Sequence, residues 1–282
     1  MTTARTNENL LGLERPVVVR VRDILAADRA GLGSGSGTMA ERLIITIDGP
    51  AGTGKSTVAR ALAHRLGLDL LDTGAMYRAA AAIAIETGLD PADPSTHPRL
   101  VAEVERHDLH FDFDADPPTL LCRGESIMHR LRDADVTRLV SPVAAIDKLR
   151  QEMVKKQRQI AIAHPRLVTE GRDQGSVVFP DADVKFYMFA SARVRAERRA
   201  DQLRAARREA DVDRLEQEIQ QRDDSDTRRT VGPLTCPADA ERIDTSDMGF
   251  DQVVDALEAH VKRVLGSRAF ARPGQRAPKI HH

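Results

Sequence analysis

The sequence predicts an α/β fold in which a parallel sheet carries helices on both faces. Short apolar segments typical of buried strands alternate along the chain with segments of helical periodicity. A glycine-rich loop joins the first apolar segment to the first helical one, as in phosphate-binding folds. The chain has 282 residues, which suits one large domain or two small ones.

Each expected strand is a short apolar run. The strands are predicted at 42–48, 68–72, 166–171, 183–190 and 241–246. The first helix is predicted at 55–66, because Val58, Leu62 and Leu66 recur every fourth residue and Gly67 follows them. Further helices are predicted at about 75–87, 141–163 and 250–265.

One segment departs from this rhythm and predicts a small antiparallel insert. Residues 108–114 alternate strictly between apolar and polar side chains, and a second apolar run follows at 119–124. A proline-containing turn separates them, which is the pattern of a β-hairpin. We therefore expect a β-containing insert at about 95–139, within a domain that spans 41–265.

The two ends of the chain differ in composition from the part between them. Residues 29–38 form a Gly/Ser-rich linker, so 1–40 are expected to be a disordered N-terminal extension. Met39 is an alternative start, and composition does not separate an appended segment from mis-called upstream sequence. The Pro/Gly/Arg-rich tail at 266–282 is also expected to be disordered.

Composition argues against several classes of protein. The 42 Lys and Arg residues nearly balance the 43 Asp and Glu residues, and Trp is absent, so no nucleic-acid partner is expected. The longest apolar run, 79–85, is far shorter than a membrane span. Cys122 and Cys236 form no metal or disulfide pattern, which favours a reducing cytoplasmic location.

The segment DGPAGTGKST at 48–57 matches the phosphate-binding pattern G-x-x-x-x-G-K-[ST]. Its glycines allow backbone N–H groups to point at phosphate oxygens, and the next helix adds its positive N-terminus. Lys55 is expected to contact the β- and γ-phosphates of a bound nucleotide, and the Ser56 hydroxyl to bind the accompanying Mg²⁺. A plain glycine-rich turn is the alternative, which the flanking strand and helix disfavour. The expected ATP-binding residues are Gly49, Pro50, Ala51, Gly52, Thr53, Gly54, Lys55, Ser56 and Thr57.

Phosphate-binding loops occur in GTPases, motor ATPases and small-molecule kinases. No lysine lies in the [NT]-K-x-D pattern that recognises guanine. The strand at 166–171 offers only Glu170 where a motor ATPase has Asp or Asp-Glu. A kinase of a phosphorylated acceptor needs a second group of cations. Arg78 and Arg172 follow the second and third strands, where ligands bind in open α/β sheets.

Further candidate cations are Arg150 and the arginines of RDDSDTRR at 222–229. Each candidate has a plainer interpretation. Arg78 alone suits a solvated helix, and the segment 170–175 suits a tight turn with an Arg–Asp pair. Residues 193–229 contain 11 Arg but also ten acidic residues, which is typical of a solvated helical surface.

Five motifs in order resemble the bacterial cytidylate kinase family over about 43–265. They are IDGPAGTGKST, LLDTGAMYR, VSPVAAIDKLR, EGRDQGSVVFPDADVKFYMFAS and RDDSDTRR. The resemblance implies a P-loop NTPase core, a nucleotide-binding insert, a short Arg-rich helical lid at about 193–230, and a monomer. Ser225 stands where some relatives have Arg, so one lid cation is absent.

The resemblance also implies roles for individual residues. Thr73, which is Ser in many relatives, and Arg78 would hold the acceptor nucleotide, and Ser141, Arg150 and Asp173 would recognise its cytosine. Asp226 would lie near the pentose with Arg222. Arg172, also a substrate-binding residue, and Arg229 would contact the acceptor or transferring phosphates. The expected catalytic residues are Lys55, Arg172, Arg222 and Arg229.

The implied activity is phosphoryl transfer from ATP to CMP or dCMP. Two alternatives stay open at this point. One is a P-loop kinase of another small acceptor, and the other is a regulatory module in which ATP acts only as a switch. ADP released only in the presence of CMP separates the kinase from both.

Overall fold

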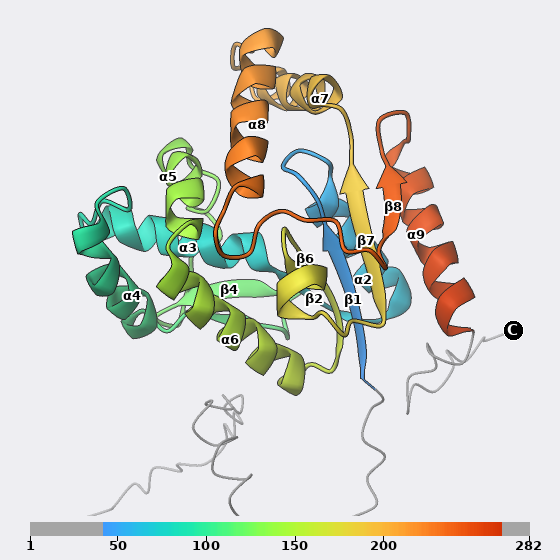
Figure 1. Cartoon of the computed structure of the whole chain (residues 1–282), viewed down its shortest axis with the longest axis horizontal. Helices are drawn as coiled ribbons and strands as arrows, with labels where there is room; N and C mark the ends of the chain where they lie inside the picture. Colours follow the sequence, from blue (N-terminus) through green and yellow to red (C-terminus); the bar gives the residue numbers. More distant parts are fainter. Residues whose placement is uncertain (1–41, 267–282) are drawn as a thin grey trace, which may run out of the picture. The chain divides into compact units, whose positions relative to one another are not determined.

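The computed structural model describes residues 42–266, and its centre is a parallel sheet (Figure 1). Within these residues the sheet has five strands in the order β2-β6-β1-β7-β8. Every neighbouring pair in it is parallel. The strands are β1 (Leu43–Asp48), β2 (Asp69–Asp72), β6 (Arg166–Gly171), β7 (Val184–Phe189) and β8 (Glu241–Asp244). Each lies within one or two residues of its predicted limits. The predictions for 1–40 and for most of 266–282 fall outside the described residues.

Two apolar cores lie on opposite faces of the sheet because β1 is buried along its whole length. Ile44 belongs to one core, while Ile45 and Ile47 belong to the other. The first core packs against α3 (Thr73–Glu86), α4 (His97–Arg106), α5 (Ala134–Ala144) and α6 (Asp147–Ala163). The second packs against α2 (Lys55–Leu66) and α9 (Phe250–Leu265). This arrangement confirms the predicted fold class.

The alternating segment forms the predicted antiparallel hairpin. Strand β3 (His110–Asp112) pairs with β4 (Thr119–Cys122), and β4 pairs with a two-residue strand, β5 (Glu125–Ser126). Leu120 of β4 is fully buried in the same core as α3. The hairpin is therefore attached to the parallel sheet through α3 rather than by strand pairing.

The prediction of one long helix at 141–163 is wrong. The chain leaves helical geometry at Ile146, whose ψ is 105°, so that α5 ends before α6 begins. Pro142 lies inside α5 and lacks the N–H needed to continue the hydrogen-bond ladder there. The side chain of Ile146 is buried in the core, which fixes the break.

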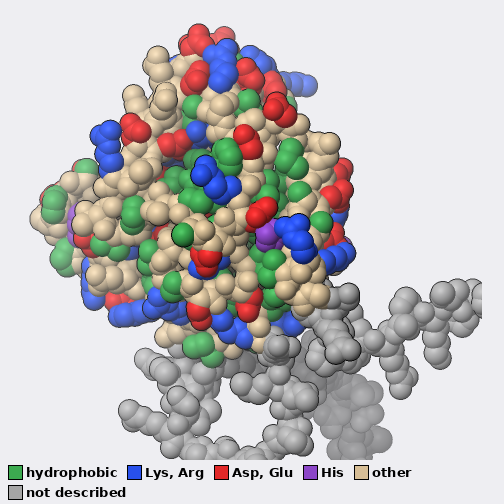
Figure 2. All heavy atoms as spheres, turned by 45° about the vertical axis from the view of Figure 1, so that its right-hand side comes forward, with side chains coloured by type: hydrophobic (Ala, Val, Ile, Leu, Met, Phe, Trp, Pro, Cys, Tyr) green, Lys and Arg blue, Asp and Glu red, His purple; other side chains and the backbone are tan. Residues whose placement is uncertain are grey.

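Two further helices, α7 (Ala192–Ala205) and α8 (Val212–Thr227), pack side by side beyond the carboxyl ends of the strands (Figure 1). They carry most of the Arg-rich segment. Cationic and anionic side chains are interspersed over the face drawn in Figure 2. No helix within 42–266 is long and apolar enough to cross a membrane.

The start of the phosphate-binding loop lies against β7. Gly49 has φ +144°, and a Cβ there would overlap the backbone carbonyl of Met188. Because both groups belong to the backbone of the central sheet, neither can move aside without disturbing strand pairing. The close approach of loop and strand therefore requires glycine at this position.

We expect Gly49→Ala to lower the free energy of unfolding by about 3 kcal/mol or more, because overlap adds to backbone strain. Urea denaturation measures this. The matched control is Gly88→Ala, where φ is +65° but nothing lies within 4 Å of the added Cβ. That variant should lose only about 1–2 kcal/mol. Equal losses in the two variants would contradict the steric argument.

Candidate active site

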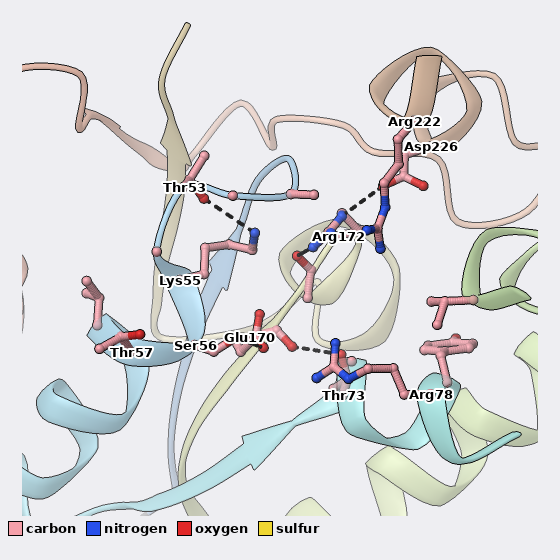
Figure 3. Close-up of a pocket in the computed structure, with 18 of the residues that line it drawn as sticks. Thr53, Lys55, Ser56, Thr57, Thr73, Arg78, Glu170, Arg172, Arg222 and Asp226 are labelled. Atoms are coloured by element: carbon pink, nitrogen blue, oxygen red, sulfur yellow. Dashed lines mark hydrogen bonds and ion pairs between the residues drawn. The ribbon is translucent and has the colours of Figure 1, made fainter. Parts of the chain in front are cut away.

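A cavity of about 680 Å³ opens where the parallel strands end. Its lining comes from the phosphate-binding loop, the N-terminal half of α3, the residues that follow β6, and α7 and α8. This is the edge at which open α/β sheets bind ligands. Figure 3 shows Lys55 and Arg172 directed into the same space, with Arg222 and Asp226 reaching it from α8.

The N-terminus of α2 lacks a partner side chain for its backbone N–H groups. Gly54 is the N-cap, with φ 88° and no side-chain cap, and the first turn contains no acidic residue. Uncapped N–H groups and the positive end of the helix dipole form a site for an anion. The loop and helix therefore have the geometry that the phosphate-binding motif predicts.

Lys55 is buried, and its ammonium group is held within its own loop. Nζ donates a hydrogen bond of 2.7 Å to the carbonyl of Pro50 and lies 3.4 Å from Oγ1 of Thr53. Burial lowers the pKa of Lys55, and the neighbouring Arg172 lowers it further. Its described hydrogen-bond acceptors are thus neutral oxygens, so an anion entering the loop would be its better partner.

A carboxylate and a hydroxyl meet beside the loop. The Ser56 hydroxyl donates a hydrogen bond of 2.7 Å to Oε1 of Glu170, at the end of β6. Burial raises the pKa of Glu170, and the charge of Asp72 adds to this effect. Both groups offer the oxygen atoms that Mg²⁺ prefers. Sequence reasoning noted Glu170 only as a weak sign of a motor ATPase.

Asp48 is a buried carboxylate that the sequence analysis did not single out. It accepts hydrogen bonds from the backbone N–H groups of Gln174 at 2.8 Å and Gly175 at 2.7 Å. Burial raises the pKa of Asp48 to about 6, although these hydrogen bonds oppose the increase. Asp48 thereby ties the start of the loop to the π-helical turn Gln174–Val178 that follows β6.

Arginines from two segments meet at one carboxylate. Arg172 Nε donates a hydrogen bond of 2.9 Å to Oδ2 of Asp226, and Arg229 bonds the other oxygen. Within 42–266, Arg222 has no hydrogen bond or ion pair with another side chain. Burial, together with Arg172, lowers the pKa of Arg222 to about 10. This part of the cavity therefore has more positive charge than the carboxylate balances.

Four arginines that line the cavity share one feature. Each has a buried Nε–H without a hydrogen-bond partner in the described structure. They are Arg78, Arg150, Arg222 and Arg229. Unused donors on buried cations are costly unless a ligand satisfies them. These arginines concentrate positive charge around the cavity, which suits phosphate-bearing ligands.

The part of the cavity next to α3 and α6 contains two ion pairs. Arg78 lies 3.1 Å from Asp72, which also accepts a hydrogen bond from the N–H of Ala75 and so caps α3. Arg150 and Asp173 form an ion pair in which both side chains are buried. The Arg150 guanidinium lies 5.3 Å from the ring centroid of Tyr77, a lining residue that the sequence analysis missed.

The structure brings most of the predicted site residues together. Thr73 also lines the cavity, and its hydroxyl donates a hydrogen bond of 2.7 Å to the carbonyl of Glu170. Gly49, Pro50 and Ser141 are not among the lining residues. Gly49 and Pro50 lie at the start of the loop, whereas Ser141 lies on α5 beside Val140, which does line the cavity.

Comparisons with known proteins identify the family. A family model described as cytidylate kinase matches residues 45–263. The cytidylate kinase of Corynebacterium glutamicum is 44% identical over 215 residues, which cover 76% of this chain and 92% of that protein. The cytidylate kinase of Nocardia farcinica is 40% identical and covers 80% of this chain and 96% of its own length. The chain belongs to the cytidylate kinase family.

Proposed function

We propose that this chain transfers the γ-phosphoryl group of ATP to CMP or dCMP, which gives ADP and CDP or dCDP. The observation that carries the proposal is a single cavity in which an uncapped phosphate-binding loop faces arginines with unused donors. We further propose that the enzyme is a cytoplasmic monomer of pyrimidine nucleotide metabolism, as its family suggests. The two free cysteines are compatible with a reducing compartment.

The donor nucleotide is proposed to bind along the loop, with its phosphates at the N-terminus of α2. Lys55 would exchange the Pro50 carbonyl for a phosphate oxygen. The described residues contain no group of three or more His, Cys, Asp or Glu suited to a metal ion. Ser56 and Glu170 fit Mg²⁺ that arrives with ATP, since both side chains offer oxygen ligands and they bond each other at the loop. The ion would neutralise charge on the phosphates.

The acceptor is proposed to bind between α3 and α8. Thr73 and Arg78 would hold its phosphate, while Ser141, Arg150 and Asp173 would recognise its base. Oδ2 of Asp173 is bonded to Arg150, but Oδ1 has no hydrogen bond in the described residues. An unpaired carboxylate oxygen that lines the cavity can accept from the N4 amino group of cytosine.

Catalysis in this proposal depends on positioning and charge neutralisation rather than on a general base. The attacking phosphate oxygen of CMP is already ionised at neutral pH. Lys55, Arg172, Arg222 and Arg229 would surround the transferring phosphoryl group from several sides. Because α8 lines the cavity, its closure over bound nucleotides would also exclude the water that could hydrolyse ATP.

The test of the proposed function is a coupled assay for ADP. We expect ADP release to require CMP, and Lys55→Ala to lower kcat at least about a hundredfold, because a cation matched to the developing charge is lost. The folded state should persist, as thermal denaturation would show. CMP-independent ADP release would favour the regulatory module. Activity with an unrelated acceptor and none with CMP would favour another small-molecule kinase.

The choice of base gives a second prediction. In Asp173→Asn, Arg150 should hold the side-chain oxygen and leave the NH₂ group facing the base. That group suits O4 of uracil better than N4 of cytosine. We expect the CMP/UMP ratio of kcat/KM to narrow at least about tenfold. An unchanged ratio would remove Asp173 from base recognition.

The control for base choice is Arg150→Lys, which should lower kcat/KM for both nucleotides together. Arg150→Met is less suitable, because it would leave the Asp173 carboxylate buried without its partner.

Arg222 gives a prediction about stability. Its folded pKa lies below the unfolded value, so the cation destabilises the ligand-free protein at every pH below about 10. Arg222→Gln should therefore raise the free energy of unfolding by about 1 kcal/mol between about pH 6 and pH 8, since partial solvent contact reduces the full effect. The same variant should lower kcat at least about a hundredfold. A loss of stability would mean that Arg222 has stabilising partners in solution.

A further inference from the structure

Arg195 lies outside the cavity. Its guanidinium bonds the phosphate-binding loop, α8 and the residue that follows β7. The residue belongs to α7 and is 4% exposed. Nη1 donates to the carbonyl of Ala51 in the phosphate-binding loop at 3.0 Å. Nη2 donates to Oδ2 of Asp223 on α8 at 2.6 Å, and Nε donates to the carbonyl of Ala190 at 3.0 Å.

The three contacts require the shape of arginine. A guanidinium is planar and directs its N–H groups along fixed directions, whereas a lysine ammonium is a single point of charge on a flexible stem. The loop also packs directly on this side chain, because a Cβ at Gly52 would lie 3.3 Å from the Cβ of Arg195. Arg195 thus holds the loop through both packing and a hydrogen bond.

Asp223 is the neighbour of Arg222 in α8, and it depends on Arg195. Oδ1 of Asp223 is buried without a hydrogen-bond partner in the described structure. Its described ion pair is the one with Arg195. The same guanidinium therefore bonds both the phosphate-binding loop and the residue of α8 that precedes Asp224 and follows Arg222.

We propose that Arg195 is a positioning residue that fixes Arg222 relative to the phosphate-binding loop. This inference rests on the proposed phosphoryl transfer. A shift of the loop carbonyl at Ala51 moves Arg195, and Asp223 moves with it because one rigid group bonds both. Occupation of the loop by the donor phosphates is thereby linked to the placement of a cation at the transferring group.

Arg193 provides a matched control on the same helix. It also connects α7 to α8, through Asp213 at 2.5 Å and Glu216 at 3.4 Å. Its side chain is 49% exposed, and in the described part of the chain it neither bonds the loop nor lines the cavity. If the contact between the two helices were all that mattered, substitution of Arg193 would have the same effect as substitution of Arg195.

The experiment compares Arg195→Lys, Asp223→Asn and Arg193→Lys. A misplaced catalytic group loses rate without losing substrate binding, so Arg195→Lys should lower kcat about tenfold to a hundredfold while KM for ATP and CMP changes less than about threefold. Asp223→Asn should lower kcat less, and Arg193→Lys less than about twofold. Equal losses in Arg195→Lys and Arg193→Lys would overturn the proposal.

A double-mutant cycle with Arg222→Gln separates positioning from general stability. If Arg195 acts through Arg222, Arg195→Lys should change kcat less than about threefold in the Arg222→Gln background. An undiminished loss there would assign Arg195 a structural role only.

Hydrogen exchange gives a readout that does not depend on activity. ADP should protect the amides of 219–229 in the wild-type protein, and Arg195→Lys should abolish that protection. Protection that persists in the variant would overturn the link. Wild-type protein without CMP-dependent ADP release would instead refute the proposed function and leave this exchange test valid.

Discussion

The buried carboxylate of Asp226 makes the contact that holds together the part of the cavity between β6 and α8. It is 1% exposed and bonds Arg172, which follows β6, and Arg229, which follows α8. Burial alone would raise the pKa of Asp226, but Arg172 and Arg229 outweigh it and hold that pKa below its usual range. The carboxylate is therefore ionised at neutral pH, and it fastens a helix that carries cations to the core. Arg195 and Asp223 make a second connection nearer the phosphate-binding loop.

This arrangement keeps cations near one another without enough carboxylates to neutralise them. Arg222 is the clearest case, because neighbouring Arg172 and burial both disfavour its charge. Such groups make the ligand-free protein less stable than an ordinary surface would, and two anionic nucleotides would offset the cost. The Nε–H donors that lack a partner in the described structure also lower the stability of the ligand-free protein, since folded proteins rarely leave buried donors without a hydrogen bond. The free energy of unfolding is therefore lowered by the same unpaired cations that the binding of anionic ligands requires.

Local patterns predicted the parallel sheet, the helix after the loop and the hairpin, because apolar periodicity and turn residues act over a few positions. The break between α5 and α6 at Ile146 was missed because it depends on packing of that side chain against residues far away in the sequence. Arg195 looked like one of many surface arginines, and its bond to Ala51 joins residues 144 positions apart. Asp48 could have been found, as a carboxylate that ends a largely apolar strand and directly precedes the loop. No comparable sequence pattern marked Tyr77 as a residue that lines the cavity.

The site owes its compactness to the end of β6. Ser56 bonds Glu170, Asp226 bonds Arg172, and Arg150 bonds Asp173. Residues 170–173 therefore make three of the side-chain contacts that hold the site together. The neighbouring strands fix where these side chains lie, because β6 pairs with β1 at Ile47–Glu170 and with β2 at Asp72–Glu170. Successive strand residues face opposite sides, so a slip of one residue would exchange the faces of Glu170 and its neighbours. The two hydrogen bonds from the turn after β6 to Asp48 oppose such a slip. Strand register thus sets the distance between the proposed donor and acceptor nucleotides, and the side chains supply the contacts to each nucleotide.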